Sequence, residues 1–377
     1  MAFVRLDEVI KRVHTKVDKD NTDLIYYVGG EHIDSEIIRV TKRGLIEGST
    51  IGPMFYYGFK AGDFLLVSRN PHLKKAGVVG FDGICSEKTF VLNTVDERRL
   101  LPEFLPFILQ NDLFWDYAYR HRHGSTNTFI NWSTLASYEF ELPDLDTQRQ
   151  LATVLWSIND TMEAYKKLIS ATDELVKSQF IVMFGNPLLN EMKWPVQKMK
   201  DVAPSSPYNG NISSNGKLYW LLNLDMVESN TGRIIDKVYV PMDEIGPSTT
   251  TFSSEYVLFS KLRPYLNKVV IPDDSGYATT ELIPMLPNPG LLKQVYLAQM
   301  LRGDEFLTFI SAQVSGTKMP RVTMNVFWDF EVMLPPLELQ EQFASFVQQS
   351  DKSKFELEQA LSELTATYKR IISENLG

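Results

Sequence analysis

Apolar residues recur at alternating steps of four and three in two stretches of this chain. In the first stretch they fall at Leu151, Leu155, Ile158 and Met162, and then more loosely at Tyr165, Ile169, Val176, Phe180 and Met183. In the second they fall at Phe343, Val347, Leu357 and Leu361, and then at Leu364 and Tyr368, with interruptions at Ser350 and Lys354. This spacing is typical of a coiled-coil seam, so each stretch predicts a long helix. We expect the first four residues named in each stretch to pack between the two helices.

A Leu-Pro pair precedes each predicted helix and marks its start, because proline disfavours helix in the residue before it. Asp146 is the expected N-cap of the first helix. Such a stripe can also pack onto an ordinary domain core. A length of roughly 35 residues, or about 50 Å, and the occurrence of two such stretches favour two helices that pack on each other.

The sequence around each helix start occurs twice. Residues 141–155 read ELPDLDTQRQLATVL, and residues 333–347, 192 positions later, read MLPPLELQEQFASFV. At offsets of 192 or 193 further residues match in order, including Leu6 with Met199, Phe64 with Val257, Pro71 with Pro264, Gly83 with Gly276 and Gly124 with Gly316. The near-constant offset predicts two equivalent halves, each a domain followed by a helix.

Connectivity predicts how these parts are arranged. The first helix ends where the second domain begins, so a second helix that pairs with it must run back toward the first domain. The predicted fold class is therefore α+β, with two pseudo-symmetric mixed α/β domains at opposite ends of two long antiparallel helices that form a coiled coil. The expected boundaries are residues 1–145 and 187–336 for the domains, and 146–186 and 337–377 for the helices.

Short β-branched runs bounded by Gly, Pro, Asn and Asp predict strands in both domains. They are DFLLVS, AGVVGF and KTFVLNT in the first domain, and DKVYVP, EYVLFS and NKVVIP in the second. The runs LPFILQNDLFWDYAYRH and LLKQVYLAQMLRGDEFLTFIS are predicted to be helical. Neither domain shows the strand–helix alternation with a phosphate loop that is typical of nucleotide-binding folds.

Composition bounds the class of protein. A length of 377 residues suggests two or three domains. A single cysteine, Cys85, excludes a disulfide framework and favours a reducing compartment. The opening MAFVRLDEVIKRV is too polar for a signal peptide, and no run of about 18 apolar residues exists to span a membrane. We therefore expect a soluble, cytoplasmic protein without a membrane partner.

The net charge of −9 weighs against a nucleic-acid partner until its location is considered. Residues 141–185 and 332–377 each carry a net charge of −3 and together hold most of it. The two long domains are close to neutral, so each can present a basic face.

The sequence contains only incomplete versions of the motifs that would support catalysis or metal binding. The segment GNISSNGK at residues 210–217 resembles a P-loop, but it has five residues between its glycines, where a P-loop has four. Leu218 also stands where a P-loop has the Ser or Thr that binds magnesium. We therefore expect this segment to form a turn. The histidines of His121-Arg122-His123 lack further ligands at metal-binding spacing. IPDD at 271–274 lacks a following Glu-x-Lys and predicts a turn, and Cys85 is expected to be a buried structural thiol.

What remains is a binding function. Basic and polar stretches occupy equivalent places in the two domains: SRNPHLKK (68–75) and RHRHGSTNT (120–128) in the first, KLRPYLNK (261–268) and SGTKMPR (315–321) in the second. Their side chains suit phosphates and base edges, and Gly and Pro suggest loops on a rigid frame. The alternative is that they are solvated surface turns. The candidate DNA-binding residues are Arg69, Asn70, His72, Lys74, Lys75, Arg120, Arg122, His123, Ser125, Asn127, Lys261, Arg263, Tyr265, Asn267, Lys268, Thr317, Lys318 and Arg321.

The two repeated phrases, each preceded by GST or SGT, resemble the specificity subunits of type I restriction-modification systems. The first copy runs through Gly124, Ile130, Leu135, Phe140, Leu142-Pro143 and Gln148, and the second through Gly316, Val322, Phe327, Val332, Leu334-Pro335 and Gln340. The chain departs from the family pattern where Asp144 replaces the second proline, where Ser350 and Lys354 interrupt the second seam, and where it begins directly at the first domain.

The resemblance implies that each domain is a target recognition domain that reads one half of a bipartite, asymmetric site in double-stranded DNA. It implies that the helices set the spacer and dock two methyltransferase subunits, and that restriction (translocase) subunits join the complex. It also implies a non-catalytic chain, without a catalytic residue, metal or cofactor of its own, whose partners carry S-adenosylmethionine, ATP and Mg. Two other hypotheses remain: an assembly scaffold or silent variant that does not bind DNA, and an enzyme with an unrecognised site.

Overall fold

The computed structural model describes residues 2–316 and 318–376 and divides into two compact units. Unit 1 comprises residues 1–165 and 360–377, and unit 2 comprises residues 166–359. Two helices of 40 residues each, α5 (Leu145–Phe184) and α10 (Leu337–Leu376), contribute to both units. We call the part of unit 1 before α5 the first domain, and the part of unit 2 between α5 and α10 the second domain.

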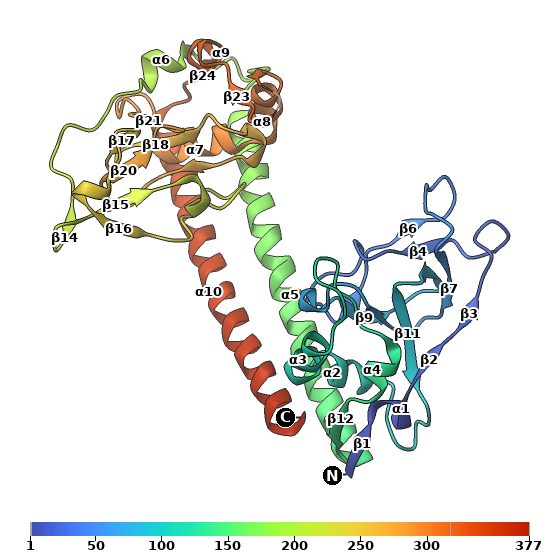
Figure 1. Cartoon of the computed structure of the whole chain (residues 1–377). Coiled ribbons are helices and arrows are strands. Elements are labelled where there is room, and N and C mark those ends of the chain that lie inside the picture. Colours follow the sequence, from blue (N-terminus) through green and yellow to red (C-terminus); the bar gives the residue numbers. More distant parts are fainter. Residues whose placement is uncertain (1, 317, 377) are drawn as a thin grey trace. The chain divides into compact units, whose positions relative to one another are not determined.

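The first domain contains two five-stranded sheets and one two-stranded sheet (Figure 1). One five-stranded sheet has the order β3 (Thr15–Lys16), β7 (Phe55–Phe59), β10 (Gly83–Ser86), β4 (Tyr26–Val28), β6 (Gly44–Leu45). The other has the order β2 (Ile10–Val13), β11 (Thr89–Thr94), β8 (Phe64–Val67), β9 (Ala76–Val79), β5 (Arg39–Val40). The two-stranded sheet pairs β1 (Ala2–Arg5) with β12 (Glu139–Leu142), and the helices are α1 (Leu6–Val9), η1 (Pro71–Leu73), α2 (Leu105–Leu109), α3 (Asp112–Arg120) and α4 (Trp132–Ala136).

The second domain is built from corresponding elements. Its larger sheet has the order β14 (Ser214–Asn215), β15 (Leu218–Leu222), β20 (Gly276–Thr279), β17 (Thr249–Phe252), with β16 (Val238–Pro241) also on β15. Its other sheets are β19 (Val269–Val270), β18 (Val257–Ser260), β21 (Leu282–Met285), then β13 (Val196–Lys198) with β24 (Glu331–Met333), and β22 (Val314–Ser315) with β23 (Arg321–Val322). The helices are α6 (Met199–Val202), η2 (Leu224–Met226), η3 (Met242–Glu244), η4 (Pro264–Leu266), α7 (Gln294–Arg302), α8 (Asp304–Ser311) and α9 (Met324–Asp329).

The two domains share the same core topology and register. In the first, β10 runs parallel to β4 and antiparallel to β7, with Gly83 opposite Phe59. In the second, β20 runs parallel to β15 and antiparallel to β17, with Gly276 opposite Phe252. Both pairs are related by the offset of 193 seen in the sequence. The prediction of an α+β fold in which one mixed α/β domain is repeated is confirmed.

The matched glycines mark a close approach of backbone and aromatic ring. A Cβ on Gly83 would lie 2.6 Å from the Phe59 ring and 2.7 Å from the carbonyl oxygen of Tyr26. A Cβ on Gly276 would lie 2.8 Å from the carbonyl oxygen of Trp220 and 3.0 Å from the Phe252 ring. Glycine is required at both places because the neighbouring backbone cannot give way.

The start of α5 differs from the prediction. The side chain of Asp144 accepts a hydrogen bond from the backbone N–H of Thr147 at 2.8 Å, and α5 begins at Leu145. Asp144 is therefore the N-cap, and the expectation that Asp146 caps the helix was wrong. Pro336 occupies the equivalent place before α10, so the residue by which this chain departs from the family motif supplies a cap instead of a proline.

A buried glutamine ties the first turn of each long helix to its own domain. Gln148 donates from Nε2 to the carbonyl oxygens of Arg99 and Pro143 at 2.9 and 2.8 Å, and accepts from the N–H of Leu101. Gln340 makes the same three bonds to Leu291, Pro335 and Lys293. Both glutamines are fully buried. These bonds explain why Gln recurs six residues after each Leu-Pro start signal.

The two long helices pack against each other in each unit, in antiparallel directions (Figure 1). In unit 1 the last turns of α10 join the first turns of α5 in one core, which includes Leu155, Ile372 and Leu376. In unit 2 the last turns of α5 meet the first turns of α10, where the Phe343 ring packs against those of Phe180 and Phe184. Each helix thus lies beside the opposite end of the other.

Several predicted helix-pairing residues lie in these contacts. Leu151 packs on the unit 1 core, Val347 packs on the unit 2 core, and the Sδ of Met162 accepts a hydrogen bond from Thr365 of α10 at 3.8 Å. Ile158, Leu357 and Leu361 are half-buried along the helices, and their role in pairing stays a prediction.

An arginine in each unit also links the domain to its long helix. Arg39 pairs with Asp160 and Glu163 of α5, and its guanidinium lies 4.6 Å from the centroid of the Trp156 ring. Arg233 pairs with Glu358 of α10 at 2.9 Å. Because these charge-assisted contacts, and the stacking of Arg39 on Trp156, favour a defined geometry, they help to fix each domain on its helix.

Each of the two domain segments that were predicted to be helical forms two helices. Gln110 and Asn111 separate α2 from α3, and the Asn111 side chain caps α3 by accepting from the N–H of Leu113. Gly303 separates α7 from α8. Asparagine and glycine both favour a break of this kind. Among the described residues, no helix is long and apolar enough to cross a membrane.

Candidate nucleic-acid interface

The two predicted binding loops of the first domain lie side by side. The backbone N–H of Asn70 donates to the carbonyl oxygen of Thr128 at 2.7 Å, and that of Ile130 donates to Ser68 at 2.9 Å. The 68–75 loop leaves the buried strand β8, so these bonds hold the 120–128 loop against a rigid frame.

The second domain joins its two loops by the same bonds. The N–H of Arg263 donates to the carbonyl oxygen of Pro320 at 2.7 Å, and that of Val322 donates to Lys261 at 2.9 Å. The sequence showed that the loops occupy equivalent places, and the structure shows that in each domain they form one surface. We call each surface a loop pair: residues 68–75 with 120–128, and 261–268 with 315–321.

The backbone of each loop pair follows the same unusual path. Left-handed residues flank a short 3₁₀ turn in both domains, namely Asn70 and Lys74 around η1, and Arg263 and Asn267 around η4. Non-glycine residues adopt this conformation rarely, and asparagine more readily than most. A tight turn repeated at both places indicates that one loop architecture was duplicated with the domain.

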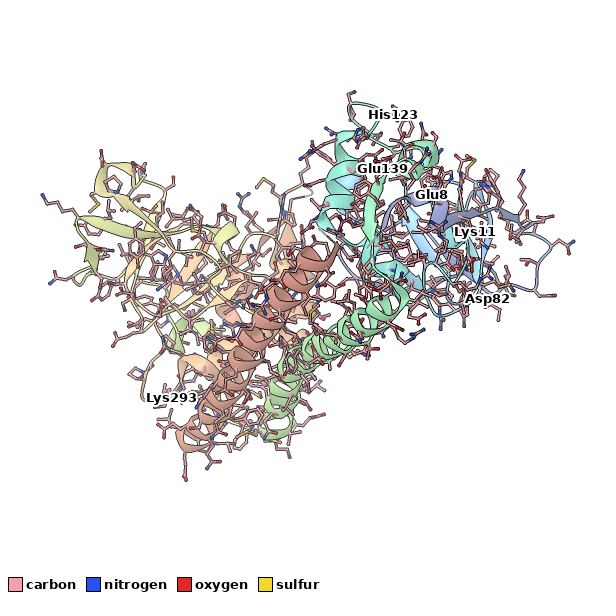
Figure 2. All side chains as sticks on the ribbon, turned by 90° about the horizontal axis from the view of Figure 1, so that it is seen from below. Glu8, Lys11, Asp82, His123, Glu139 and Lys293 are labelled. Atoms are coloured by element: carbon pink, nitrogen blue, oxygen red, sulfur yellow. The ribbon has the colours of Figure 1, made fainter. Side chains whose placement is uncertain are left out.

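The first loop pair presents cationic and polar side chains to solvent. Arg69, His72, Arg120, His123, Ser125 and Asn127 are exposed, and Asn70 is half-buried. Figure 2 shows His123 on the loop that follows α3. Its ring lies 5.6 Å from that of Phe129, with which it also shares two backbone hydrogen bonds. This surface can offer both charge and planar groups to a nucleic acid.

The second loop pair is similar in character. Arg263, Lys318 and Arg321 are exposed, Lys261 is half-buried, and the Tyr265 ring is 55% exposed. Arg321 pairs with Glu281 at 2.9 Å, which raises the pKa of the guanidinium. Thr317, also a candidate, lies outside the described residues.

Four candidate side chains are engaged by other residues of their own domain. Lys75 donates from Nζ to the carbonyl oxygen of Gly30 at 2.7 Å, and its equivalent Lys268 donates to that of Leu224 at 2.6 Å. Asn267 is buried and donates to the carbonyl oxygen of Arg302 at 2.8 Å. Lys74 pairs with Asp112 and Glu36 at 2.6 and 3.0 Å. These bonds favour a structural role for the four side chains.

Arg122 is also partly engaged. It donates to the carbonyl oxygen of Tyr119 at 2.6 Å, and its guanidinium lies 3.7 Å from the centroid of the Tyr119 ring. Arg120 is the better placed of these two arginines to meet a ligand, because its side chain is exposed.

Lys88 was missed by the sequence reasoning. Its carbonyl oxygen accepts hydrogen bonds from the N–H and Oγ of Ser68, which places it beside the first loop pair. Its side chain is 45% exposed and pairs with Glu87. Glu281 holds the equivalent place in the second domain and pairs with Arg321. No sequence signal identifies Lys88, because its position depends on the pairing of β8 with β11.

The groups considered for other chemistry occupy structural positions. Cys85 is fully buried in β10, and burial raises the pKa of its thiol to about 12, as expected of a structural thiol. The GNISSNGK segment forms the predicted turn, a hairpin between β14 and β15 with Gly216 and Lys217 left-handed. Within residues 2–316 and 318–376, no group of three or more His, Cys, Asp or Glu is arranged to hold a metal ion.

Comparison with known proteins shows that part of the chain is similar to one described family. Residues 191–365, which cover most of the second domain and much of α10, match the family described as the type I restriction modification DNA specificity domain. The chain is 22% identical over 323 residues to the type I restriction enzyme MjaIX specificity subunit of Methanocaldococcus jannaschii. That alignment covers 77% of this chain and 71% of the relative.

Solved structures share the fold over the whole chain. The type I restriction-modification S subunit from M. genitalium aligns with a TM-score of 0.60 and 13% identity, covering 100% of this chain and 96% of that one. A chain from a structure concerning complex assembly and conformational transition of the type I R-M system aligns with a TM-score of 0.56 and 17% identity. It covers 99% of this chain and 97% of its own length. At these identities the likeness concerns the fold.

Proposed function

We propose that the chain is a specificity subunit of a type I restriction-modification system and that each of its domains reads one half of a bipartite DNA site. One observation carries the proposal. The same loop pair, closed by the same two backbone hydrogen bonds, occurs once in each domain and presents exposed cations each time. Two like surfaces on two like domains suit a target with two separate halves.

The side chains of the two loop pairs differ, so the two halves of the site differ. Where the first domain has Asn70, the second has Arg263, and where the first has His72, the second has Tyr265. Asparagine and arginine favour adenine and guanine edges respectively. Because a protein reads bases through such side chains, the same frame can hold two different specificities. The target is therefore asymmetric.

We propose that the long helices set the spacer between the halves and dock two methyltransferase subunits. The two helical segments carry −6 of the net charge of −9. This acidic charge lies away from the loop pairs in the sequence and suits contact with protein partners rather than DNA. Partner subunits would supply further cationic surface around the duplex.

The chain itself is a non-catalytic, cytoplasmic recognition subunit in this proposal. Methyl transfer from S-adenosylmethionine belongs to the methyltransferase subunits, and ATP with Mg belongs to restriction subunits that join the complex. The buried Cys85 thiol, with its raised pKa, offers no accessible nucleophile.

Competition binding tests this function. The chain is combined with its methyltransferase subunit and a labelled duplex that carries the methylation motif of the source cell, and unlabelled duplexes compete. We expect the motif duplex to compete at least about a thousandfold better than a scrambled duplex. The chain alone is expected to bind weakly and with strong salt dependence. Equal competition by the scrambled duplex would favour an assembly scaffold instead.

A further inference from the structure

Unit 2 contains a cleft between the second domain and the two long helices. Its volume is about 730 Å³, and it is lined by α5, α7, α10, the loop at residues 230–233 and Ile271. Small-molecule sites typically have volumes of about 300–1,000 Å³. No described residue of the second loop pair lines the cleft, so it is separate from the surface proposed to bind DNA.

The internal repeat explains why this place is open. In unit 1 the equivalent place holds three aromatic rings, because the Phe107 ring lies 5.2 Å from that of Trp156 and 6.3 Å from that of Tyr368. The residues related to these three by the offset of 192 are Gln299, Gln348 and Val176. Two amides and a valine thus replace three rings, and the space that the rings would fill is left open.

Gln299 of α7 is a buried polar group that lines the cleft. It is only 8% exposed. Within the described part of the chain, its side-chain amide makes no hydrogen bond. A buried amide without a partner costs free energy, because it has given up its hydrogen bonds to water. A polar group bound in the cleft would satisfy it.

Arg302, three residues further along α7, supplies a positive charge. Its Nε and Nη2 donate to the carbonyl oxygen of Val269 at 3.1 and 2.8 Å. Burial lowers the pKa of the guanidinium to about 10, so it remains charged at neutral pH. None of the described carboxylates forms an ion pair with it. A buried cation in this situation favours a ligand that carries an anionic group.

The remaining charges of the cleft restrict what that ligand can be. Lys177, Arg233 and Lys354 are each paired with an acidic side chain of the cleft, namely Glu174, Glu358 and Asp173. Asp351 is exposed and has no hydrogen bond or ion pair with any described residue. One cation and one anion are thus left over among the residues that line the cleft. This balance suits a zwitterion better than a phosphate dianion.

The cleft also offers an apolar surface. The Phe355 ring is 57% exposed, although it is a large apolar group, and it lines the cleft together with aliphatic side chains such as Val295 and Ile271. The equivalent residue in unit 1 is Glu163, which pairs with Arg39. An exposed ring beside an aliphatic wall suits a ligand that carries an aromatic ring, because two rings can stack.

We propose that this cleft binds a zwitterionic aromatic compound of the amino-acid class. The ligand's carboxylate meets Arg302 and Gln299, its ammonium group meets Asp351, and its ring packs on Phe355. In unit 1 the residues equivalent to Arg302 and Asp351 are the uncharged Gln110 and Asn159. The two halves of the repeat therefore differ in this site, although they share the loop pairs.

Calorimetric titration of the full chain with L-phenylalanine tests the proposal. One molecule should bind per chain. Two matched compounds, 3-phenylpropionate without the ammonium group and phenylalaninamide without the carboxylate, should each bind at least about tenfold more weakly. Absence of saturable binding of L-phenylalanine at millimolar concentrations, or equal binding of all three compounds, would overturn the proposal.

The repeat also supplies variants that are expected to fold. Gln110 donates to the carbonyl oxygen of Ala76 at 2.6 Å, as Arg302 does to that of Val269, so Arg302→Gln can keep this contact and remove only the charge. Arg302→Gln and Asp351→Asn should each weaken binding of L-phenylalanine at least about tenfold. Glu356→Gln is the control, because Glu356 is an exposed acid of α10 outside the cleft. Equal affinities of Asp351→Asn and Glu356→Gln would contradict the assigned site.

Filling the cleft gives a second measurement. Gln299→Phe with Val176→Tyr introduces two of the rings found in unit 1 and should abolish binding. L-Phenylalanine should raise the melting temperature of the wild-type chain but not that of the filled variant. An equal rise in both would overturn the proposal. None of the substituted residues belongs to a loop pair, so this outcome would leave the proposed reading of DNA standing.

Discussion

Lys354 of α10 donates two hydrogen bonds to the carboxylate of Asp173 on α5, at 2.7 and 2.8 Å. At the equivalent place in unit 1, 192 positions away for each residue, Thr365 donates to the sulfur of Met162. Unit 2 thus links α5 to α10 by an ion pair, and unit 1 links the two helices by a largely apolar contact. Lys354, expected to interrupt the helical seam, instead links the two helices.

Lys354→Met should destabilise unit 2 by about 1–2 kcal/mol, because it leaves the half-exposed Asp173 carboxylate without its partner. The double variant Lys354→Met, Asp173→Thr installs the pair found in unit 1 and should recover most of that loss. Urea unfolding of the two variants measures this difference. If the double variant were as unstable as the single one, the two contacts would not be equivalent.

Gly83→Ala should destabilise the first domain by about 1–3 kcal/mol, because the new Cβ meets the Phe59 ring and the Tyr26 carbonyl oxygen. Gly276→Ala should cost a similar amount in the second domain. Gly80→Ala is the control, because a Cβ there meets nothing within 4 Å. Thermal unfolding of the three variants provides the test. Equal melting temperatures for Gly80→Ala and Gly83→Ala would refute the close approach of Gly83 to Phe59 and Tyr26.

Cys85 should resist thiol reagents in the folded chain and react fully after unfolding. Burial holds its pKa at about 12, against an ordinary value of 9.0. Above pH 9 the unfolded chain loses this proton while the folded chain keeps it. The contribution of Cys85 to stability should therefore fall as pH rises from about 9 toward 12. Comparison of unfolding free energies with Cys85→Ala across this range isolates the effect, and rapid labelling at pH 8 would contradict it.

Arg263→Ala should weaken DNA binding by the assembled complex by about 1–3 kcal/mol without unfolding the second domain. Its side chain is exposed, while its backbone N–H holds the loop pair together and survives the substitution. Arg98→Ala is the matched control, since Arg98 is exposed but pairs with Asp96 outside both loop pairs. Anisotropy titrations at several salt concentrations would show the difference, and identical affinities would remove Arg263 from the interface.

The repeat made much of this fold predictable from sequence. The offset that relates Gly83 to Gly276 also relates their cross-strand partners, Phe59 and Phe252. Local signals were less reliable: Asp146 and Asp144 are both acidic residues near the helix start, and only the backbone geometry selects Asp144 as the cap. The helix breaks at Asn111 and Gly303 were overlooked because the apolar pattern continues across them.

Side-chain direction in the loops could not be read from sequence. Arg263 and Asn267 belong to one short loop, yet the first side chain is exposed and the second is buried against Arg302. Lys75 and Lys268 likewise resemble free surface cations, although their ammonium groups reach backbone carbonyls far away in the chain. Such contacts depend on tertiary structure, so residue type alone overestimates the number of groups available to DNA.

Sequencing that detects methylated bases, in cells that carry the complete complex, tests the central claim most directly. The wild-type chain should give one motif with two specified halves and an unspecified gap. Replacing Arg263, Tyr265 and Lys318 with alanine should relax one half and leave the other intact. A continuous motif, or simultaneous loss of both halves, would contradict the account of two equivalent domains that each read one half-site.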